Sequence, residues 1–174
     1  MMRKALFLSV LTALAVLCGP AGLHGQEDPS TSCDVRKAGL DPVKFHLYLT
    51  KDTPYTAWPL WPGTSAMAPA RPPFSHGTFR TTYVNPAALR SIREGRGMDF
   101  GALIVTESFD AGRKLTGLSV KLKIRGYHPE AGDWHWFQYD AGGAVLSCGR
   151  TAVCIGCHAA RKENDYLMTE PARE

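Results

Sequence analysis

Residues 117–126 read "GLSVKLKIRG" and decide the fold, because apolar and polar side chains alternate along them without a break. A period of two is typical of a β-strand that has one face against a core and the other in water. The apolar face would consist of Leu118, Val120, Leu122 and Ile124, and the polar face of Ser119, Lys121, Lys123 and Arg125. We therefore expect a half-buried strand whose lysines are solvated.

Three neighbouring segments also have the composition of strands. "GTFRTTYV" (77–84) and "WHWFQY" (134–139) are rich in β-branched and aromatic residues, and "FGALIVTESF" (100–109) has an apolar middle. The stretches "DAGRK" (110–114), "YHPEAGD" (127–133) and "DAGG" (140–143) are turn-like. Connections this short join antiparallel neighbours, so the sequence predicts an antiparallel meander.

Short helices are expected at the start and in the middle of this meander. Asp41 and Asn85 are good N-caps, and each precedes a proline that suits the first helical turn. Between them, residues 54–73 carry six prolines, which exclude a long helix or a central strand. The expected fold class is therefore α+β: a predominantly antiparallel sheet with a few short helices.

The first 25 residues have the pattern of a secretory signal peptide, with a positive start, a short apolar run and a small-residue end. We expect removal near Gly22 or Gly25, a periplasmic location and no membrane span in the mature chain. Cys18 follows Leu17 rather than a small residue, which disfavours a lipid anchor. Residues 26–53 would form an arm with a short helix, and residues 54–174 the functional domain.

Composition narrows the class of partner. Hydrophobic residues make up 44% of the chain and charged residues 21%, as in ordinary globular proteins. The formal charge of +4 falls to +2 once Arg3 and Lys4 leave with the signal peptide. Nothing in this balance indicates a nucleic-acid partner.

Four cysteines remain in the expected mature chain, and an oxidising compartment favours their pairing. If Cys154 and Cys157 serve one motif, Cys33 and Cys148 are left as a disulfide pair. That bond would close a loop of over a hundred residues and stabilise the fold by roughly 4 to 5 kcal/mol in the chain-entropy model. Two unpaired buried thiols are the alternative.

Residues 154–158 read "CIGCH", which fits the C-x-x-C-H pattern of covalent c-type haem attachment. Thiols at this spacing reach the two vinyl groups at one porphyrin edge, and the histidine that follows is carried beneath the iron. The motif near the C-terminus therefore predicts one haem c, held by Cys154 and Cys157, with His158 as the axial iron ligand.

Two other uses of the same residues stay open. A structural zinc site would need a fourth ligand, which Cys148 or His135 could supply, although a second paired motif is missing. A redox disulfide would normally belong to a βαβ unit, and the pattern of strands here predicts none.

The sequence resembles the cytochrome P460 family, to which the β-sheet type of cytochrome c′ is structurally similar. The matching stretches are "TTYVNPAAL", "GALIVTE", "KIRGYHPEAGDWHWFQYDAGG" and "CIGCHAARKENDYLMT". This resemblance implies a small periplasmic homodimer with one high-spin haem and an open or weakly occupied sixth position on the iron. It also implies a small gas or nitrogen-oxide ligand, such as nitric oxide or hydroxylamine, and a redox partner protein.

The chain departs from the family at the position of the lysine that P460 enzymes bond to the haem. P460 enzymes carry a lysine cross-linked to the haem edge, usually just before a glutamate, and here Thr106 precedes Glu107. A hydroxyl cannot replace that amine, so oxidation of hydroxylamine is an uncertain activity for this chain. By family position, Glu107 is the candidate polar group on the distal side of the haem.

Other residues could occupy the sixth position on the iron, but each of them also has an ordinary structural role. Met168 could ligate iron, but ten residues beyond His158 it is more often packing on the proximal side. The histidines at 46, 76, 128 and 135 are more often surface or hydrogen-bonded residues than ligands. A simple electron-transfer cytochrome, with a saturated iron, is the alternative function.

Overall fold

One six-stranded sheet organises the protein, and the computed structural model describes residue 33 together with residues 39–71 and 76–169. Its strands follow the chain order, and each pairs antiparallel with the next. The strands are β1 (Ala68–Pro69), β2 (Phe79–Val84), β3 (Leu103–Phe109), β4 (Leu115–Lys123), β5 (Trp134–Asp140) and β6 (Val145–Gly149). The expected α+β class with a dominant antiparallel sheet is confirmed. The expected signal peptide and Cys18 lie outside the described residues.

Two edge strands have no counterpart in the sequence prediction. β1 has only two residues, and β6 follows the turn at 140–143 with no long alternating pattern. Both form because a neighbouring strand offers unpaired backbone groups, which a short segment can satisfy whatever its own propensity. β6 matters for the site because it leads directly into the helix that carries the cysteine motif.

The helices begin where their caps predict. The side chain of Asp41 accepts hydrogen bonds from the backbone N–H groups of Val43 and Lys44, at 2.9 and 3.1 Å. Asn85 does the same for Ala88 at 2.9 Å. The helical segments are α2 (Pro42–Leu47), the π-helical turn η1 (Tyr48–Asp52), the 3₁₀ turn η2 (Tyr55–Ala57), α3 (Pro86–Arg93), the 3₁₀ turn η3 (Pro129–Ala131), α4 (Ala152–His158) and the 3₁₀ segment η4 (Ala159–Asn164).

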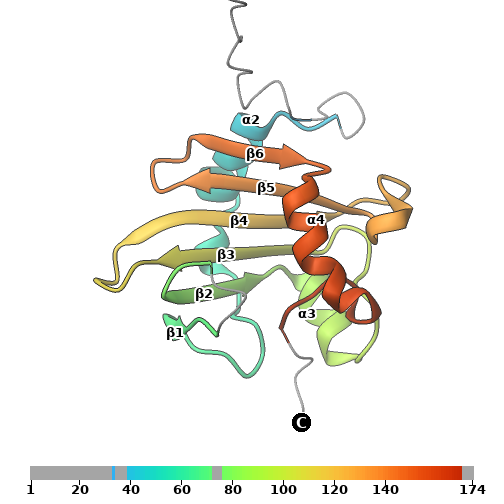
Figure 1. The fold of residues 1–174 in the computed structure, drawn as a ribbon, viewed down its shortest axis with the longest axis horizontal. Coiled ribbons are helices and arrows are strands. Elements are labelled where there is room, and N and C mark those ends of the chain that lie inside the picture. Colours follow the sequence, from blue (N-terminus) through green and yellow to red (C-terminus); the bar gives the residue numbers. More distant parts are fainter. Residues whose placement is uncertain (1–32, 34–38, 72–75, 170–174) are drawn as a thin grey trace, which may run out of the picture.

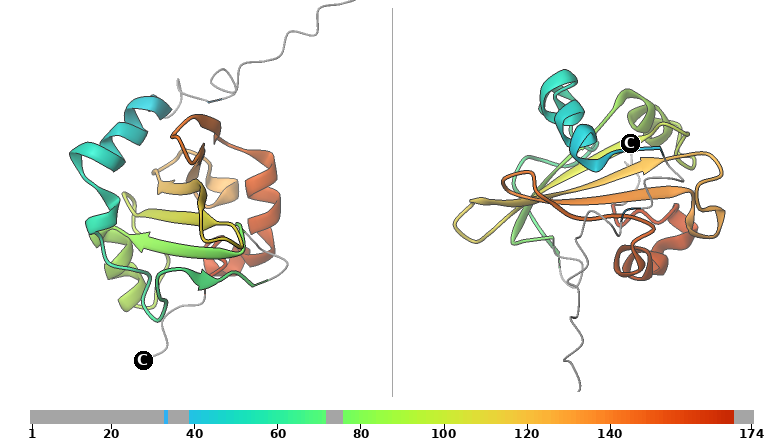
Figure 2. Two further views of the ribbon diagram at one scale, coloured as in Figure 1. Left: turned by 90° about the vertical axis from the view of Figure 1, so that its left-hand side faces the viewer. Right: turned by 90° about the horizontal axis from the view of Figure 1, so that it is seen from above.

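The sheet separates two layers of helical structure. α2 and the turns after it lie on one face, and α4 crosses the opposite face (Figures 1 and 2). On the α2 side, Phe45 and Leu49 pack with inward residues of the central strands, among them Val105, Val120 and Phe137. A second core forms where the sheet meets α3 and α4, and it includes Ile92, Ile104, Trp134, Trp136, Cys154 and Leu167. Both faces of the sheet are therefore covered.

This double covering corrects the expectation that the lysines of β4 are solvated. Lys123 is only 9% exposed, forms an ion pair with Asp165 and lies 4.9 Å from the centre of the Trp134 ring. Lys121 lies under α4. The alternation correctly gave the strand and its two faces, but a period of two cannot tell a face in water from a face beneath a second layer of protein.

A disulfide joins Cys33 to Cys148 in β6, the pair that was left over once the motif cysteines were set aside. Their Cα atoms are 4.8 Å apart, and 115 positions separate them in the sequence. The bond ties Cys33 to the edge strand β6. Among the described residues, no helix combines the length and apolar character needed to cross a membrane.

Candidate functional site

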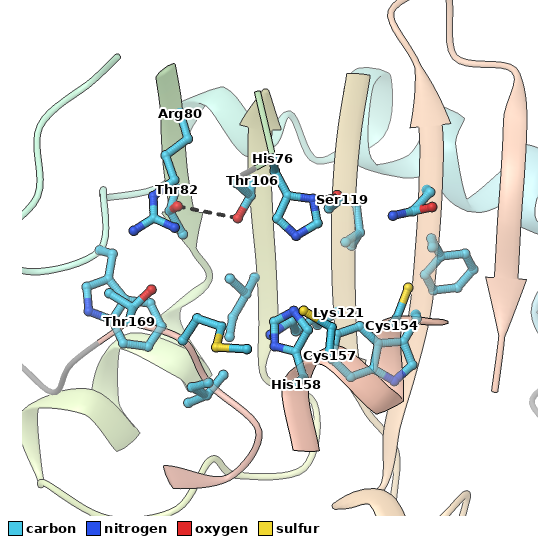
Figure 3. Close-up of a pocket in the computed structure, with 18 of the residues that line it drawn as sticks. His76, Arg80, Thr82, Thr106, Ser119, Lys121, Cys154, Cys157, His158 and Thr169 are labelled. Atoms are coloured by element: carbon cyan, nitrogen blue, oxygen red, sulfur yellow. Dashed lines mark hydrogen bonds between the residues drawn. The ribbon is translucent and has the colours of Figure 1, made fainter. Parts of the chain in front are cut away.

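The two motif cysteines and the histidine lie on one short helix. α4 spans "AVCIGCH", and positions three and four residues apart share a helix face. Cys154 and His158 are buried, whereas Cys157 is exposed, and neither thiol is in a disulfide. Figure 3 shows all three side chains at the same end of a cavity between α4 and the sheet.

His158 is oriented by the segment that follows its helix. Its Nδ1–H donates to the carbonyl oxygen of Tyr166 at 2.8 Å, which leaves Nε2 for another partner. The ring of Trp136 lies 4.7 Å away, centre to centre. Burial, then the neighbouring Lys121 charge, lowers the pKa of His158 to about 3. The imidazole is therefore neutral, which is the form that binds a metal.

The backbone around Tyr166 is shaped to present this carbonyl. Asp165 and Tyr166 both adopt left-handed conformations, with φ of 52° and 60°. A side-chain oxygen of Asp165 accepts from the N–H of Met98 at 2.9 Å, and its backbone oxygen accepts from the indole of Trp134 at 2.9 Å. These contacts hold an otherwise unfavourable turn in place.

Lys121 shares the same carbonyl. Its Nζ donates to the Tyr166 oxygen at 3.2 Å, lies 3.0 Å from Nδ1 of His158, and is 4.7 Å from the centre of the Trp136 ring. Burial lowers the pKa of Lys121 to about 7. This amine was not singled out from the sequence, because its strand face was interpreted as solvent-exposed.

The sheet side of the cavity is a row of small polar side chains across four strands. Thr82, Thr106 and Ser119 occupy paired positions of β2, β3 and β4, and Gln138 of β5 continues the row. The hydroxyl groups of Thr82 and Thr106 lie 3.3 Å apart, as Figure 3 shows. Thr106 therefore presents its hydroxyl to the cavity.

Two further polar residues line the cavity away from α4. Ser119 Oγ lies 3.3 Å from Nδ1 of His76, and the ring centres of His76 and His158 are 6.4 Å apart. Burial, then the charges of Lys121 and Arg80, lowers the pKa of His76. Arg80 also lines the cavity. From the sequence, His76 was judged more often an ordinary histidine than a ligand and Arg80 was given no role, because only the paired strands bring them to the motif.

Glu107 does not line this cavity, in contrast to the distal position expected from the family resemblance. It lies beyond the cavity lining, on the α2 side of the sheet, where Tyr55 and Tyr83 donate to its carboxylate at 3.0 and 3.4 Å. The reason is the pleat, since consecutive residues of a strand point to opposite faces. With Thr106 facing the cavity, Glu107 must face away from it.

The other candidates for the sixth position lie in different surroundings. Met168 lines the same cavity as His158. His46 lies on the other face of the sheet, 4.8 Å from the ring of Tyr139, and His128 faces Glu130 at 3.7 Å. Of the four additional histidines considered, His76 is the one that lines this cavity.

The residues expected to complete a zinc site do not come together with the cysteine motif. Cys148 is held in the disulfide, and His135 is stacked between Tyr127 and Phe137 at 4.8 and 4.3 Å. Within the described ranges, no group of three His, Cys, Asp or Glu side chains is placed to hold a metal ion. The two expected sources of a fourth ligand are thus engaged elsewhere.

The cavity suits a haem in its chemistry. It contains about 1040 Å³ of space that no atom fills, open solvent at its mouth included. Trp61, Ile104 and Leu167 give it apolar walls. Among the described lining residues, Arg80 and Lys121 are cationic and none is a carboxylate, which complements the anionic propionates of a haem. The two free thiols and the neutral imidazole match its vinyl groups and iron.

Comparison with known families agrees with this geometry, since the sequence model of the family described as cytochrome P460 matches residues 54–169. The chain belongs to the cytochrome P460 family. It is therefore a haem protein, and the matched region includes every residue of the cavity discussed above. No curated protein matches the chain.

Proposed function

We propose that this cytochrome P460 family member is an exported mono-haem c-type cytochrome that binds small nitrogen oxides, nitric oxide first among them. The observation that carries the proposal is the convergence of Cys154, Cys157 and His158 on one cavity. A c-type site needs two thiols at one edge of a pocket and an imidazole beside them, and α4 presents that set.

Covalent attachment follows from the two free thiols. Cys154 and Cys157 would each hold the haem by a thioether, formed by addition of S–H across one vinyl double bond, which needs no leaving group and no net electron transfer. The bound haem would supply an iron centre that takes up a diatomic nitrogen oxide reversibly. His158 would hold this iron through Nε2, while the Tyr166 carbonyl fixes the orientation of the ring.

Binding of nitric oxide is better supported than oxidation of hydroxylamine. Thr106 presents a hydroxyl to the cavity where P460 enzymes would present the cross-linking lysine. The row of Thr82, Thr106 and Ser119 gives this part of the sheet side hydroxyl groups in place of an amine. We therefore propose that the chain binds small ligands and lacks the haem–lysine cross-link of P460 enzymes.

The cell compartment and the partners belong to the same proposal. The signal-peptide pattern in residues 1–25 and the Cys33–Cys148 disulfide both favour an oxidising location, which in this case would be the periplasm. A homodimer and a redox partner protein are proposed from the family resemblance. Size-exclusion chromatography with light scattering on the holoprotein tests the dimer.

The experiment is expression in the periplasm with haem maturation machinery, followed by intact mass and an optical titration with nitric oxide. We expect a coloured protein with the mass of the mature chain plus one haem, and a spectrum that nitric oxide changes. A Cys154→Ala/Cys157→Ala variant is the matched control and should lose the covalent haem. A colourless wild-type protein of polypeptide mass would overturn the proposal.

Electron transfer is the second candidate, and one observation favours it. Val153, which is 82% exposed, and the exposed Cys157 both line the cavity, so the edge of a haem bound there would lie near the surface. An exposed edge is what rapid electron exchange requires. A holoprotein that exchanges electrons rapidly but shows no spectral change with nitric oxide would favour this function over ligand binding.

A further inference from the structure

His76 faces the motif histidine across the cavity. The centres of the two imidazole rings are 6.4 Å apart and their planes are inclined by 33°. Figure 3 shows the labelled rings of His76 and His158 in the same cavity, one on the loop before β2 and the other on α4. Two imidazoles from distant segments thus approach each other inside the site.

Both rings are anchored through the same nitrogen. Nδ1 of His158 is bonded to the Tyr166 carbonyl, and Nδ1 of His76 contacts the hydroxyl of Ser119. Nε2 is then the nitrogen available for a metal in His158, and also in His76 when its Nδ1–H donates to the Ser119 hydroxyl.

The spacing agrees with a metal atom between the rings. An imidazole nitrogen bonds a transition metal at about 2.0 Å and lies roughly 1 Å from its own ring centre, so two imidazoles on opposite sides of one iron have centres roughly 6 Å apart. The observed separation of 6.4 Å is close to this value. It is too short to leave a free diatomic ligand between an iron on His158 and the ring of His76.

The backbone that follows His76 makes a close approach to β3. Gly77 has a left-handed φ of 85°, and a Cβ there would lie 2.5 Å from the carbonyl oxygen of Phe109. The following N–H, of Thr78, donates to that same carbonyl at 2.7 Å. A glycine is required at this close approach, and it sets where His76 enters the cavity.

We propose that His76 is the second axial ligand of the haem iron, through Nε2, and that a nitrogen oxide binds by displacing it. This inference rests on the proposed function, because it assumes a haem held by His158. The resting iron would be six-coordinate and low-spin, in contrast to the high-spin state implied by the family resemblance. His76 would therefore act as a gate on the ligand site.

The test uses the purified holoprotein and its optical and electron paramagnetic resonance spectra in the ferric state. We expect a low-spin wild type and high-spin His76→Ala and His76→Phe variants. Added imidazole should restore the low-spin spectrum of His76→Ala, an effect that a purely structural role would not produce. His46→Gln, on the other face of the sheet, and Met168→Leu should stay low-spin.

Kinetics give a second readout. The rate of nitric oxide binding to the ferrous wild type should saturate with ligand concentration, because dissociation of His76 becomes limiting. In His76→Phe the observed binding rate should rise linearly with nitric oxide concentration. At low nitric oxide concentration it should be at least about tenfold faster than in the wild type, because a larger fraction of the protein is ready to bind.

The outcomes separate this inference from the proposed function. A coloured, high-spin wild type, or a low-spin spectrum that survives in both His76 variants, would overturn the assignment of His76 alone. Loss of the low-spin state in Met168→Leu but not in the His76 variants would assign the position to methionine and overturn it as well. A colourless wild type would refute the proposed function and this inference with it.

Discussion

Nζ of Lys121 lies 3.0 Å from Nδ1 of His158, and both atoms contact the carbonyl oxygen of Tyr166. A strong hydrogen bond from an axial imidazole to its acceptor makes the ligand more electron-donating, which stabilises ferric iron. Here an amine competes for the same oxygen. If His158 holds the haem iron as proposed, sharing this acceptor with Lys121 would weaken electron donation by the imidazole.

Replacing Lys121 with methionine should lower the reduction potential of the haem. The carbonyl would then accept from His158 alone, and a buried cation would be lost, and both changes favour the ferric state by an amount on the order of tens of millivolts. A spectroelectrochemical titration measures the shift. Lys114→Met, at an exposed turn position, is the control, and an unchanged or raised potential in Lys121→Met would contradict the prediction.

Protease digestion of the wild-type holoprotein should release haem on a single peptide that contains residues 154–158. Thr106 faces the cavity but has no amine that could bond to the haem edge. Mass spectrometry of the coloured peptides checks this. A haem joined to a second peptide from β2, β3 or β4 would show that another side chain replaces the lysine of P460 enzymes.

Replacing Glu107 with glutamine should leave the haem spectrum and nitric oxide binding unchanged. The carboxylate lies on the face of the sheet opposite the cavity and accepts from Tyr55 and Tyr83. Hydrogen bonds to a charged group are stronger than neutral ones, so we expect a loss of about 1 kcal/mol in the free energy of unfolding. Denaturant unfolding measures the loss, and an altered spectrum would place Glu107 back among the haem-contacting residues.

Replacing Asp165 with alanine should destabilise both the fold and the orientation of His158. Lys123 would lose its partner in surroundings where its side chain is only 10% exposed, and breaking such a pair costs about 3 kcal/mol. The N–H of Met98 would also lose its acceptor. Asp165→Asn keeps an acceptor and tolerates the left-handed φ, so its loss in unfolding free energy should be smaller. Equal losses in the two variants would show that the lost charge opposite Lys123, and not the acceptor for Met98, accounts for the effect.

Strand positions, helix caps and the cysteine motif follow from local chemistry and could be predicted. The alternation in 117–126 gave β4, and the side chains of Asp41 and Asn85 gave the starts of two helices. Each of these signals depends on residues close together in the chain. Local patterns of this kind keep their meaning whatever the rest of the fold does.

The set of side chains that line the cavity depends on contacts between distant segments, and a single sequence gives no direct signal for such contacts. His76 meets Ser119 and His158 only because β2, β3 and β4 pair and α4 crosses them. The position of Glu107 was different, since the sequence did contain the necessary information. Thr106 and Glu107 are consecutive in one predicted strand, and a strand cannot direct both to the same cavity.

Removing the Cys33–Cys148 disulfide should reduce stability without changing the haem. The bond spans 115 positions, and in the chain-entropy model a loop of that length is worth about 4 to 5 kcal/mol. It lies at the edge of the sheet on β6, and neither cysteine lines the cavity. A Cys33→Ser/Cys148→Ser double variant should therefore keep the optical spectrum of the wild type but unfold at a lower denaturant concentration. Unchanged stability would mean that the other contacts of α2 hold the N-terminal segment without the bond, whereas loss of the haem spectrum would show that β6 transmits its position to α4.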